Sequence, residues 1–301
     1  MYTSINGLRV LREIAERRTL TAAAAELGYT QSGVSRQLAA LERATGSQLV
    51  ERGAVGAQLT PAGLVLLRHA RVVLDELDHA ERELTGATRE PLRVRLGVYV
   101  SAAAALLPHI LVTARRRRPD IAITTRDGTT PALVRAIRAG SLDLALVTAQ
   151  PPFHPPDNEL PRLATTTLQE STLLVAAPST GRFAGRDSVR LDELVDAEWI
   201  ASASTAREPL LGVWPSLPGR PRVAHSTRDW LAKLNLVAAG CGLTTVPANL
   251  APLVPDGVRL LHVADGPTEK RRLLLIRMPG PPSPSVAAAQ TLLRESLLTL
   301  R

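Results

Sequence analysis

The apolar positions near the start of the chain follow helical spacing. Residues that recur every three or four positions are Ile5, Leu8, Leu11 and Ile14. Ser4 precedes them, and a serine at this place can accept a hydrogen bond from a first-turn N–H group. The pattern predicts a first helix that begins directly after Ser4.

Two further short helices follow within thirty residues. Thr19-Leu20-Thr21 offers a second cap, "AAAAEL" continues the helix, and Gly28-Tyr29 breaks it. Thr30 can cap a third helix, in which Val34, Leu38 and Leu41 form an inward stripe that ends at Gly46. Three short helices with a glycine turn before the third are typical of a helix-turn-helix.

The next segment, "QLVERGAVGAQLTPAG", reads as a short strand, a glycine-rich turn and a second strand that ends at Leu59. Thr60 and Pro61 then form a favourable start for another helix, with threonine as the cap and proline at the first helical position. The strand–turn–strand unit predicts a wing beside the helix-turn-helix.

A long helix is expected from residue 63 to residue 84. Its apolar residues are spaced by four and three in turn, as in a heptad repeat; they are Leu66, Ala70, Val73, Leu77, Ala80 and Leu84. One interpretation is a helix packed on its own domain. The favoured one is a seam between two chains, because the residues between the apolar positions, "DELDHAERE", are heavily charged.

Strand and helix patterns alternate in the remaining part of the chain. "LRVRLGVYV", "IAITTRDG" and "DLALVTA" read as strands separated by helices, which predicts a parallel sheet with right-handed crossovers. A proline-rich stretch at 149–161 precedes a second run, which includes "STLLVAAP", "GLTTVP" and "KRRLLLIR", and a final helix from about Ser285. Two α/β lobes are expected, with a cleft at the carboxyl ends of their strands.

Composition adds two constraints. The net charge is +8, but residues 1–60 hold seven Arg against five Glu, so bulk charge does not mark the N-terminal part as the one that binds a polyanion. The sole cysteine, Cys241, excludes a disulfide within the chain, and its apolar context favours a core residue over a catalytic thiol. No apolar run is long enough for a membrane span, and a cytoplasmic location is expected.

The motifs "TAAAAELGYTQSGVSRQLAALERATGSQLVER" and "LTPAG" resemble the winged helix-turn-helix of LysR-type transcriptional regulators, and "LVAAGCGLTTVP" is similar to their effector domain. The resemblance implies an α+β multidomain chain with a DNA-binding domain at 1–60, a linker or dimerisation helix at 61–88 and an effector-binding domain at 89–301. The effector domain is expected to be a two-lobed, periplasmic-binding-protein-like α/β fold. Its lobe 1 comprises about 92–163 and 264–301, and its lobe 2 about 164–263.

Candidate DNA contacts come from the third helix and its neighbourhood. With the apolar stripe turned inward, the outward face offers side chains that can hydrogen-bond bases: Gln31, Ser32, Ser35 and Arg36. Thr21 and Thr30, at helix N-termini, can bring backbone N–H groups to phosphates. Arg52 matches the arginine that the family has just before the wing.

The chain departs from the family pattern at three places in this domain. Ser32-Gly33 replaces the usual Pro-Ala at the start of the recognition helix, and Val50 replaces the usual Phe. Val55 stands in the wing where the family often has Arg, so no charged minor-groove contact is expected there.

Candidate effector contacts follow the strand ends. They are hydroxyl side chains suited to an anion, namely Ser101, Thr129, Thr130, Thr148, Ser202, Ser204 and Thr227. Arg207 and Arg228 can pair with the same anion. A helix cap is the alternative role for each hydroxyl, and no metal or cofactor is expected besides a small organic effector.

Other classes of protein fit the sequence less well. An enzyme is not expected, because the six histidines lack metal-ligand spacing and neither a phosphate loop nor a G-x-S-x-G motif is present. A secreted solute-binding protein would have an export signal and no helix-turn-helix. A regulator whose cleft is filled by its own side chains stays open. We therefore expect a homo-oligomeric regulator, dimeric through the long helix and tetrameric by family resemblance, that binds a pseudo-palindromic promoter site in double-stranded DNA, with RNA polymerase as a further partner.

Overall fold

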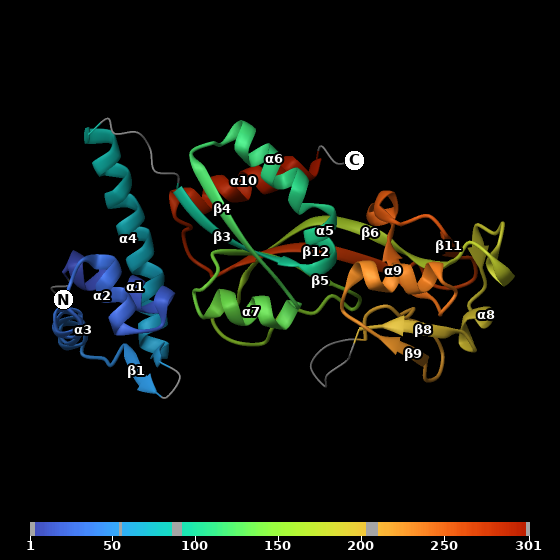
Figure 1. The fold of residues 1–301 in the computed structure, drawn as a ribbon, viewed down its shortest axis with the longest axis horizontal. Helices are drawn as coiled ribbons and strands as arrows, with labels where there is room; N and C mark the ends of the chain where they lie inside the picture. The colour runs from blue at the N-terminus through green and yellow to red at the C-terminus, as the bar shows by residue number, and fades with distance from the viewer. Residues whose placement is uncertain (1–3, 54–55, 86–91, 203–209, 299–301) are drawn as a thin grey trace.

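The computed structural model describes residues 4–53, 56–85, 92–202 and 210–298. The molecule is elongated, with a small helical domain at one end and two α/β lobes in the middle and at the other end (Figure 1). A long helix of the small domain lies beside the middle lobe, and the C-terminal helix returns to that lobe (Figure 1). The predicted multidomain α+β arrangement is confirmed.

The small domain holds the predicted helix-turn-helix and wing. Its elements are α1 (Ile5–Arg17), α2 (Leu20–Leu27), α3 (Gln31–Thr45), β1 (Val50–Gly53), β2 (Gly56–Leu59) and α4 (Pro61–Thr85). Ser4, Thr30 and Thr60 each accept a hydrogen bond from the third backbone N–H that follows, at 3.0–3.1 Å. The cap of α2 is Thr19, whose hydroxyl accepts from the N–H of Ala22. Local capping chemistry therefore fixes where these four helices begin.

Close backbone packing sets the angle between α4 and the wing. A Cβ atom at Gly63, in the first turn of α4, would lie well inside 3.0 Å of the backbone oxygen of Leu49. The hydroxyl of Thr60 donates to the backbone oxygen of Gln48 at 2.7 Å, so the cap of α4 is also tied to the start of the wing. The "LTPAG" motif is thus a packing motif that attaches the long helix to the DNA-binding domain.

The two lobes share one curled sheet with the strand order β4-β3-β5-β12-β6-β11-β7, and β10 pairs with β6 on the side opposite β11. The strands are β3 (Leu92–Tyr99), β4 (Ile121–Gly128), β5 (Leu144–Ala149), β6 (Ala164–Pro178), β7 (Ser188–Val189), β10 (Thr244–Pro247), β11 (Val258–Val263) and β12 (Lys270–Arg277). The predicted parallel pairing holds for β4, β3 and β5. From β12 through β6 to β11 the pairing is antiparallel, which the sequence pattern does not predict.

Strand β6 joins the lobes. Residues 164–172 pair with β12 in lobe 1, and residues 173–178 pair with β10 and β11 in lobe 2. The sequence predicts a strand only at 171–178 and places the lobe boundary at 164. The passage between the lobes lies instead inside this strand, near Leu173.

Helices cover both faces of the sheet in lobe 1. On one face lie α5 (Val100–Ala105), α6 (Leu107–Arg117) and α10 (Pro284–Leu298), and on the other lies α7 (Thr130–Arg138) (Figure 1). In lobe 2, α8 (Asp192–Val195), β8 (Glu198–Ala201), β9 (Arg222–Ser226) and α9 (Trp230–Ala238) complete the core with the sheet. The parallel pair of β8 and β9 is a further element absent from the sequence prediction.

Candidate functional site

Helix α3 presents a polar surface at its N-terminus. Val34, Leu38 and Leu41 are buried in the domain core, so the opposite side of the helix faces outward. Gln31, Ser32 and Arg36 are exposed there, and Ser35 is half-buried.

Arg36 makes no ion pair or hydrogen bond with any residue that the structure describes. The Thr30 hydroxyl lies 3.1 Å from Ser32 Oγ and accepts from the Gly33 N–H at the same distance. The first turn of α3 is therefore ordered by its cap, while the guanidinium beyond it stays available for an outside partner.

Of the other positions considered for DNA contact, Thr21 is exposed, and the side chain of Arg52 is not described. Thr21 is exposed in the first turn of α2 but does not cap that helix. The backbone of Arg52 lies in β1 opposite Ala57, and its side chain is outside the description. Val55, at the tip of the wing, also lies outside the described residues.

Glu42 connects α3 to the wing. One carboxylate oxygen accepts from the backbone N–H groups of Leu49 at 2.8 Å and Val50 at 3.2 Å. Both residues are at least 95% buried, so these N–H groups have no access to water as an alternative partner. The glutamate of the "LE" motif thus fixes the wing relative to the exposed face of α3.

The predicted seam residues on α4 fall on two faces. Ala70 is buried in the core of its own domain, beside Leu67 and Leu74, and Leu66 packs partly against the same core. Val73 and Leu77 are 45% and 37% exposed, and Ala80 is exposed as well. The side chain of Leu84 lies outside the description. Ala70 therefore contributes to the domain, and the apolar surface that α4 leaves open lies farther along the helix.

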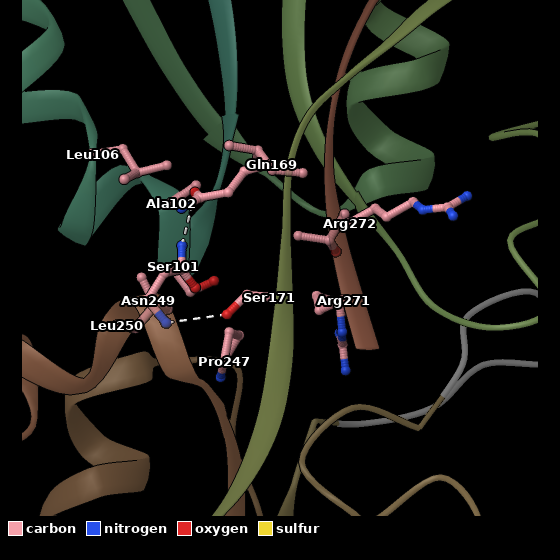
Figure 2. Close-up of a pocket in the computed structure, with 12 residues that line it drawn as sticks. Ser101, Ala102, Leu106, Gln169, Ser171, Pro247, Asn249, Leu250, Arg271 and Arg272 are labelled. Atoms are coloured by element: carbon pink, nitrogen blue, oxygen red, sulfur yellow. Dashed lines mark hydrogen bonds between the residues drawn. The ribbon is translucent and has the colours of Figure 1, made fainter. Parts of the chain in front are cut away.

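Two adjoining hollows lie between the lobes, with empty spaces of about 500 and 360 Å³, open solvent included. Both are lined by Ser101, Thr148, Pro247 and Arg271. Figure 2 shows that the smaller one is formed by both lobes, with Ser101 and Leu106 from lobe 1 and Pro247 and Asn249 from lobe 2. Asn249 donates to Ser171 Oγ and to Gln169 Oε1 on β6, at 3.1 and 3.0 Å.

The predicted effector residues separate into two groups. Ser101, Thr148 and Ser202 line the larger hollow, together with Arg228. The hydroxyls of Thr129 and Thr227 accept local backbone hydrogen bonds, from Ala132 and Asp229 respectively, which is the alternative role considered for them. Thr130 is the first residue of α7 and is not among the lining residues. Ser204 and Arg207 lie outside the described residues.

Two cations in the larger hollow, the buried Lys233 and the half-buried Arg271, were missed from the sequence. Lys233 on α9 is 7% exposed and donates to Ser202 Oγ at 2.9 Å and to the backbone oxygen of Leu211 at 3.3 Å. Burial, followed by repulsion from Arg271, lowers the pKa of Lys233 to about 8.

Arg271, at the start of β12, lies between the two hollows, and its guanidinium extends away from the strand (Figure 2). Burial lowers the pKa of Arg271 as well, and its Nε has no hydrogen-bond partner within the described chain. One signal for Lys233 was present in the sequence, because it is one of only two lysines and interrupts an apolar helix.

A winged helix-turn-helix attached to a two-lobed α/β domain with a polar cleft defines a class of DNA-binding regulators with a ligand-binding domain. Residues 5–64 match the model of the bacterial regulatory helix-turn-helix proteins of the lysR family, and residues 88–298 match the LysR substrate binding domain. The chain belongs to the LysR family of transcriptional regulators. The expectation that it is not an enzyme is confirmed by this membership.

Relatives and solved structures agree with the assignment. The chain is 31% identical to a probable hydrogen peroxide-inducible genes activator of Mycobacterium avium, over 91% of this chain and 87% of that protein. Its fold is similar to a full-length OxyR variant from Pseudomonas aeruginosa (TM-score 0.73, 17% identity, 99% and 95% of the chains covered). It is also similar to ArgP from Mycobacterium tuberculosis (TM-score 0.71, 22% identity, 99% and 98% covered).

The described ranges hold neither a membrane-spanning helix nor a metal-binding cluster. Among those residues, no helix is long and apolar enough to cross a membrane. Nor do three or more His, Cys, Asp or Glu side chains gather there in a way that could hold a metal ion.

The sole cysteine, Cys241, was expected in a core. It is half-buried and lies in the turn after α9 instead.

Proposed function

We propose that the protein acts in the bacterial cytoplasm as a homo-oligomeric regulator whose DNA binding is switched by a small organic anion held between the lobes. The observation that carries the effector class is the pair of cations that line the cleft, the buried Lys233 and the half-buried Arg271. Within the described residues neither is ion-paired with a carboxylate. The carboxylate of Glu269 and the hydroxyl of Tyr99 offset only part of the cost of desolvating Arg271, and burying a cation away from water is costly, so a site that brings two cations together is suited to a ligand of opposite charge.

The surrounding groups suit a carboxylate ligand. Ser101, Thr148 and Ser202 add neutral hydroxyl donors beside the two cations. A bound carboxylate would offset the repulsion between Lys233 and Arg271, and the pKa of Lys233 would then rise from about 8 toward its ordinary value. Binding at pH 8.5 is therefore accompanied by the uptake of a proton.

Calorimetric titration of the full chain tests this proposal, with acetate, benzoate, succinate and glutarate as probes at pH 8.5 in two buffers of different ionisation enthalpy. We expect at least one of these anions to bind with proton uptake, and Lys233→Met to abolish that uptake. Lys270→Met is the matched control, because Lys270 is the other lysine and is exposed on β12, ion-paired with Glu170 at 2.7 Å. An anion that binds the wild type and Lys233→Met equally would contradict the assignment of Lys233. Failure of all the probes would favour a regulator without an effector of this class.

For DNA, the exposed first turns of α3 are the reading surface that we propose. An arginine there can donate two hydrogen bonds to one guanine, or it can contact a phosphate. Arg36→Ala is expected to weaken binding to a selected genomic site by about 1–3 kcal/mol and to relax the preference at one base position. Arg43→Ala, in the last turn of the same helix, is the control. An unchanged affinity and sequence preference for Arg36→Ala would refute the base contact.

For assembly, we propose that the exposed apolar residues of α4, Val73 and Leu77, meet a second copy of the chain. Two recognition helices would then reach successive half-sites of a pseudo-palindrome. Leu77→Glu should give monomers by light scattering. Leu253→Glu, at a leucine that is 45% exposed elsewhere, should leave the oligomer unchanged. A tetramer and a contact with RNA polymerase stay predictions.

The peroxide response in the names of several relatives is not part of this proposal. A chain with the single cysteine Cys241 is unable to form a disulfide within itself. A thiol switch between two cysteines of this sequence is therefore excluded, and the cations of the cleft are the better indication of its signal.

A further inference from the structure

The DNA-binding domain touches lobe 1 of its own chain through polar groups. Arg71 of α4 donates to the backbone oxygen of Gly140, in the turn after α7. Glu16, near the end of α1, lies 3.7 Å from Arg95 of β3. Farther along α4, the carboxylate of Asp75 is hydrogen-bonded by Ser283, just before α10. Three separate parts of lobe 1 thus meet one face of the helical domain, at the junction between its α1 and α4 helices and the middle lobe in Figure 1.

Opposite charges follow one another across this contact, with Arg71 and Glu16 in the helical domain and Arg95 and Asp143 in lobe 1. One oxygen of Glu16 lies 3.6 Å from Arg71 and 3.7 Å from Arg95, so a carboxylate stands between two guanidinium groups. The carboxylate of Asp143 in turn accepts two hydrogen bonds from Arg95. One comes from the guanidinium at 2.6 Å and the other from the backbone N–H of Arg95 at 2.8 Å. Arg71 is 14% exposed, and burial lowers its pKa to about 10, so it remains charged at neutral pH.

We propose that Glu16 and Arg71 form a releasable polar latch that docks the DNA-binding domain on lobe 1 of the same chain, and that Asp75 beside them sets its dependence on pH. Charged groups are well solvated when they separate, so an interface made of them opens at a smaller cost than an apolar one of similar size. Release frees the recognition helix to change its orientation relative to the effector domain. Docking fixes that orientation, which two half-sites on DNA require.

The position of the latch in the sheet links it to the cleft. Arg95 lies in β3 and Asp143 directly precedes β5. The same two parallel strands end at Tyr99 and lead to Thr148, both of which line the larger hollow between the lobes. The groups that receive the latch therefore lie in the first half of β3 and just before β5, and the carboxyl ends of the same two strands reach the cleft. A DNA-binding domain docked in this way forms one body with lobe 1.

Asp75 makes the latch sensitive to pH. Burial is the main reason why its pKa is raised to about 6, with repulsion from Asp143 in lobe 1 and from Asp78 on α4 in addition. Arg12 of α1 and the hydroxyl of Ser283 act in the opposite direction. Because burial disfavours the ionised form, the docked state takes up a proton that the released state takes up only near pH 4. Docking is therefore tighter at pH 5 than at pH 7.5, by up to about tenfold if docking causes the whole shift.

Energy transfer between two dyes on one chain tests the latch. Cys241→Ser removes the sole thiol, and Arg43→Cys on α3 and Arg116→Cys on α6 introduce two exposed labelling positions. Chains labelled with both dyes are mixed with an excess of unlabelled chains, so that each oligomer carries one labelled pair. The ratio of the docked to the released population is then read from single molecules.

Two carboxylate variants are expected to act in opposite directions. Glu16→Arg places a third cation between Arg71 and Arg95, and should move most molecules to the released population. Asp75→Asn keeps a hydrogen-bond partner for Ser283 without a buried charge, and should increase docking at pH 7.5 and remove its dependence on pH. Glu295→Arg is the control, because it makes the same reversal of charge within lobe 1, where Glu295 is ion-paired with Arg117 at 3.3 Å.

Circular dichroism of each variant checks that the helices stay folded, and Glu16 is 40% exposed, so its replacement is compatible with the fold of α1. The latch is overturned if Glu16→Arg and Glu295→Arg give the same populations. A pH dependence in Asp75→Asn equal to that of the wild type would overturn the role of Asp75.

Discussion

Replacing Lys233 by methionine is expected to change how the stability of the effector domain depends on pH. The pKa of this lysine is lowered from 10.5 to about 8 in the folded chain, mainly by burial. A shift of this size corresponds to about 3 kcal/mol of destabilisation at neutral pH, from forcing an ammonium group into a buried position. Above pH 8 the folded chain loses the proton while the unfolded chain keeps it, so this penalty decreases as the pH rises toward 10.5.

Between pH 7.5 and pH 9.5 this penalty decreases by about 2 kcal/mol. The free energy of unfolding of the wild type, measured by urea denaturation with circular dichroism, should contain this gain at the higher pH. In Lys233→Met the gain should be absent, and in Lys270→Met it should remain, because Lys270 is exposed. Other groups that titrate in this range are common to all three proteins and cancel in the comparison. An equal gain in the wild type and in Lys233→Met would refute the reasoning that Lys233 is a buried cation.

Two substitutions in the DNA-binding domain test its internal packing. Glu42→Ala leaves the buried N–H groups of Leu49 and Val50 without their acceptor and should lower the free energy of unfolding by about 3 kcal/mol, whereas Glu42→Gln keeps one amide oxygen and should cost about 1 kcal/mol. Thermal unfolding followed by circular dichroism measures both, and equal melting temperatures for the two variants would contradict the assignment. Gly63→Ala drives a Cβ into the backbone of Leu49 and should destabilise the domain by about 3 kcal/mol. Gly53→Ala is its control, because a Cβ atom there has no heavy atom within 4 Å. A similar loss of stability in both variants would show that the contact with Leu49 is not the cause.

Local chemistry explains what the sequence predicts well. The N-terminal cap at Thr30 and the glycine C-caps at Gly28 and Gly46 depend on contacts within a few residues, and the structure has each of them. The heptad pattern of α4 is a different case. Periodicity identifies an apolar stripe but does not say what covers it, and Ala70 faces its own core while Leu77 stays exposed.

Contacts between distant segments explain what the sequence does not predict. Strand β6 pairs with β12, about a hundred positions later, so its length and its antiparallel direction depend on a partner that no local pattern reveals. The same is true of Lys233 and Arg271, which meet only because α9 and the start of β12 line one hollow. Strand ends located Ser101 and Thr148, since the ends of the predicted parallel strands follow from the order of the elements.

The positions of the three tryptophans give the protein a built-in optical probe. Trp199 and Trp214 are buried in the core of lobe 2, and Trp230 lines the larger hollow. The chain has no others, so the indole emission of the whole protein comes from lobe 2. A change in that emission on adding a candidate effector reports Trp230 and its surroundings, whereas unfolding of the DNA-binding domain leaves the emission unchanged.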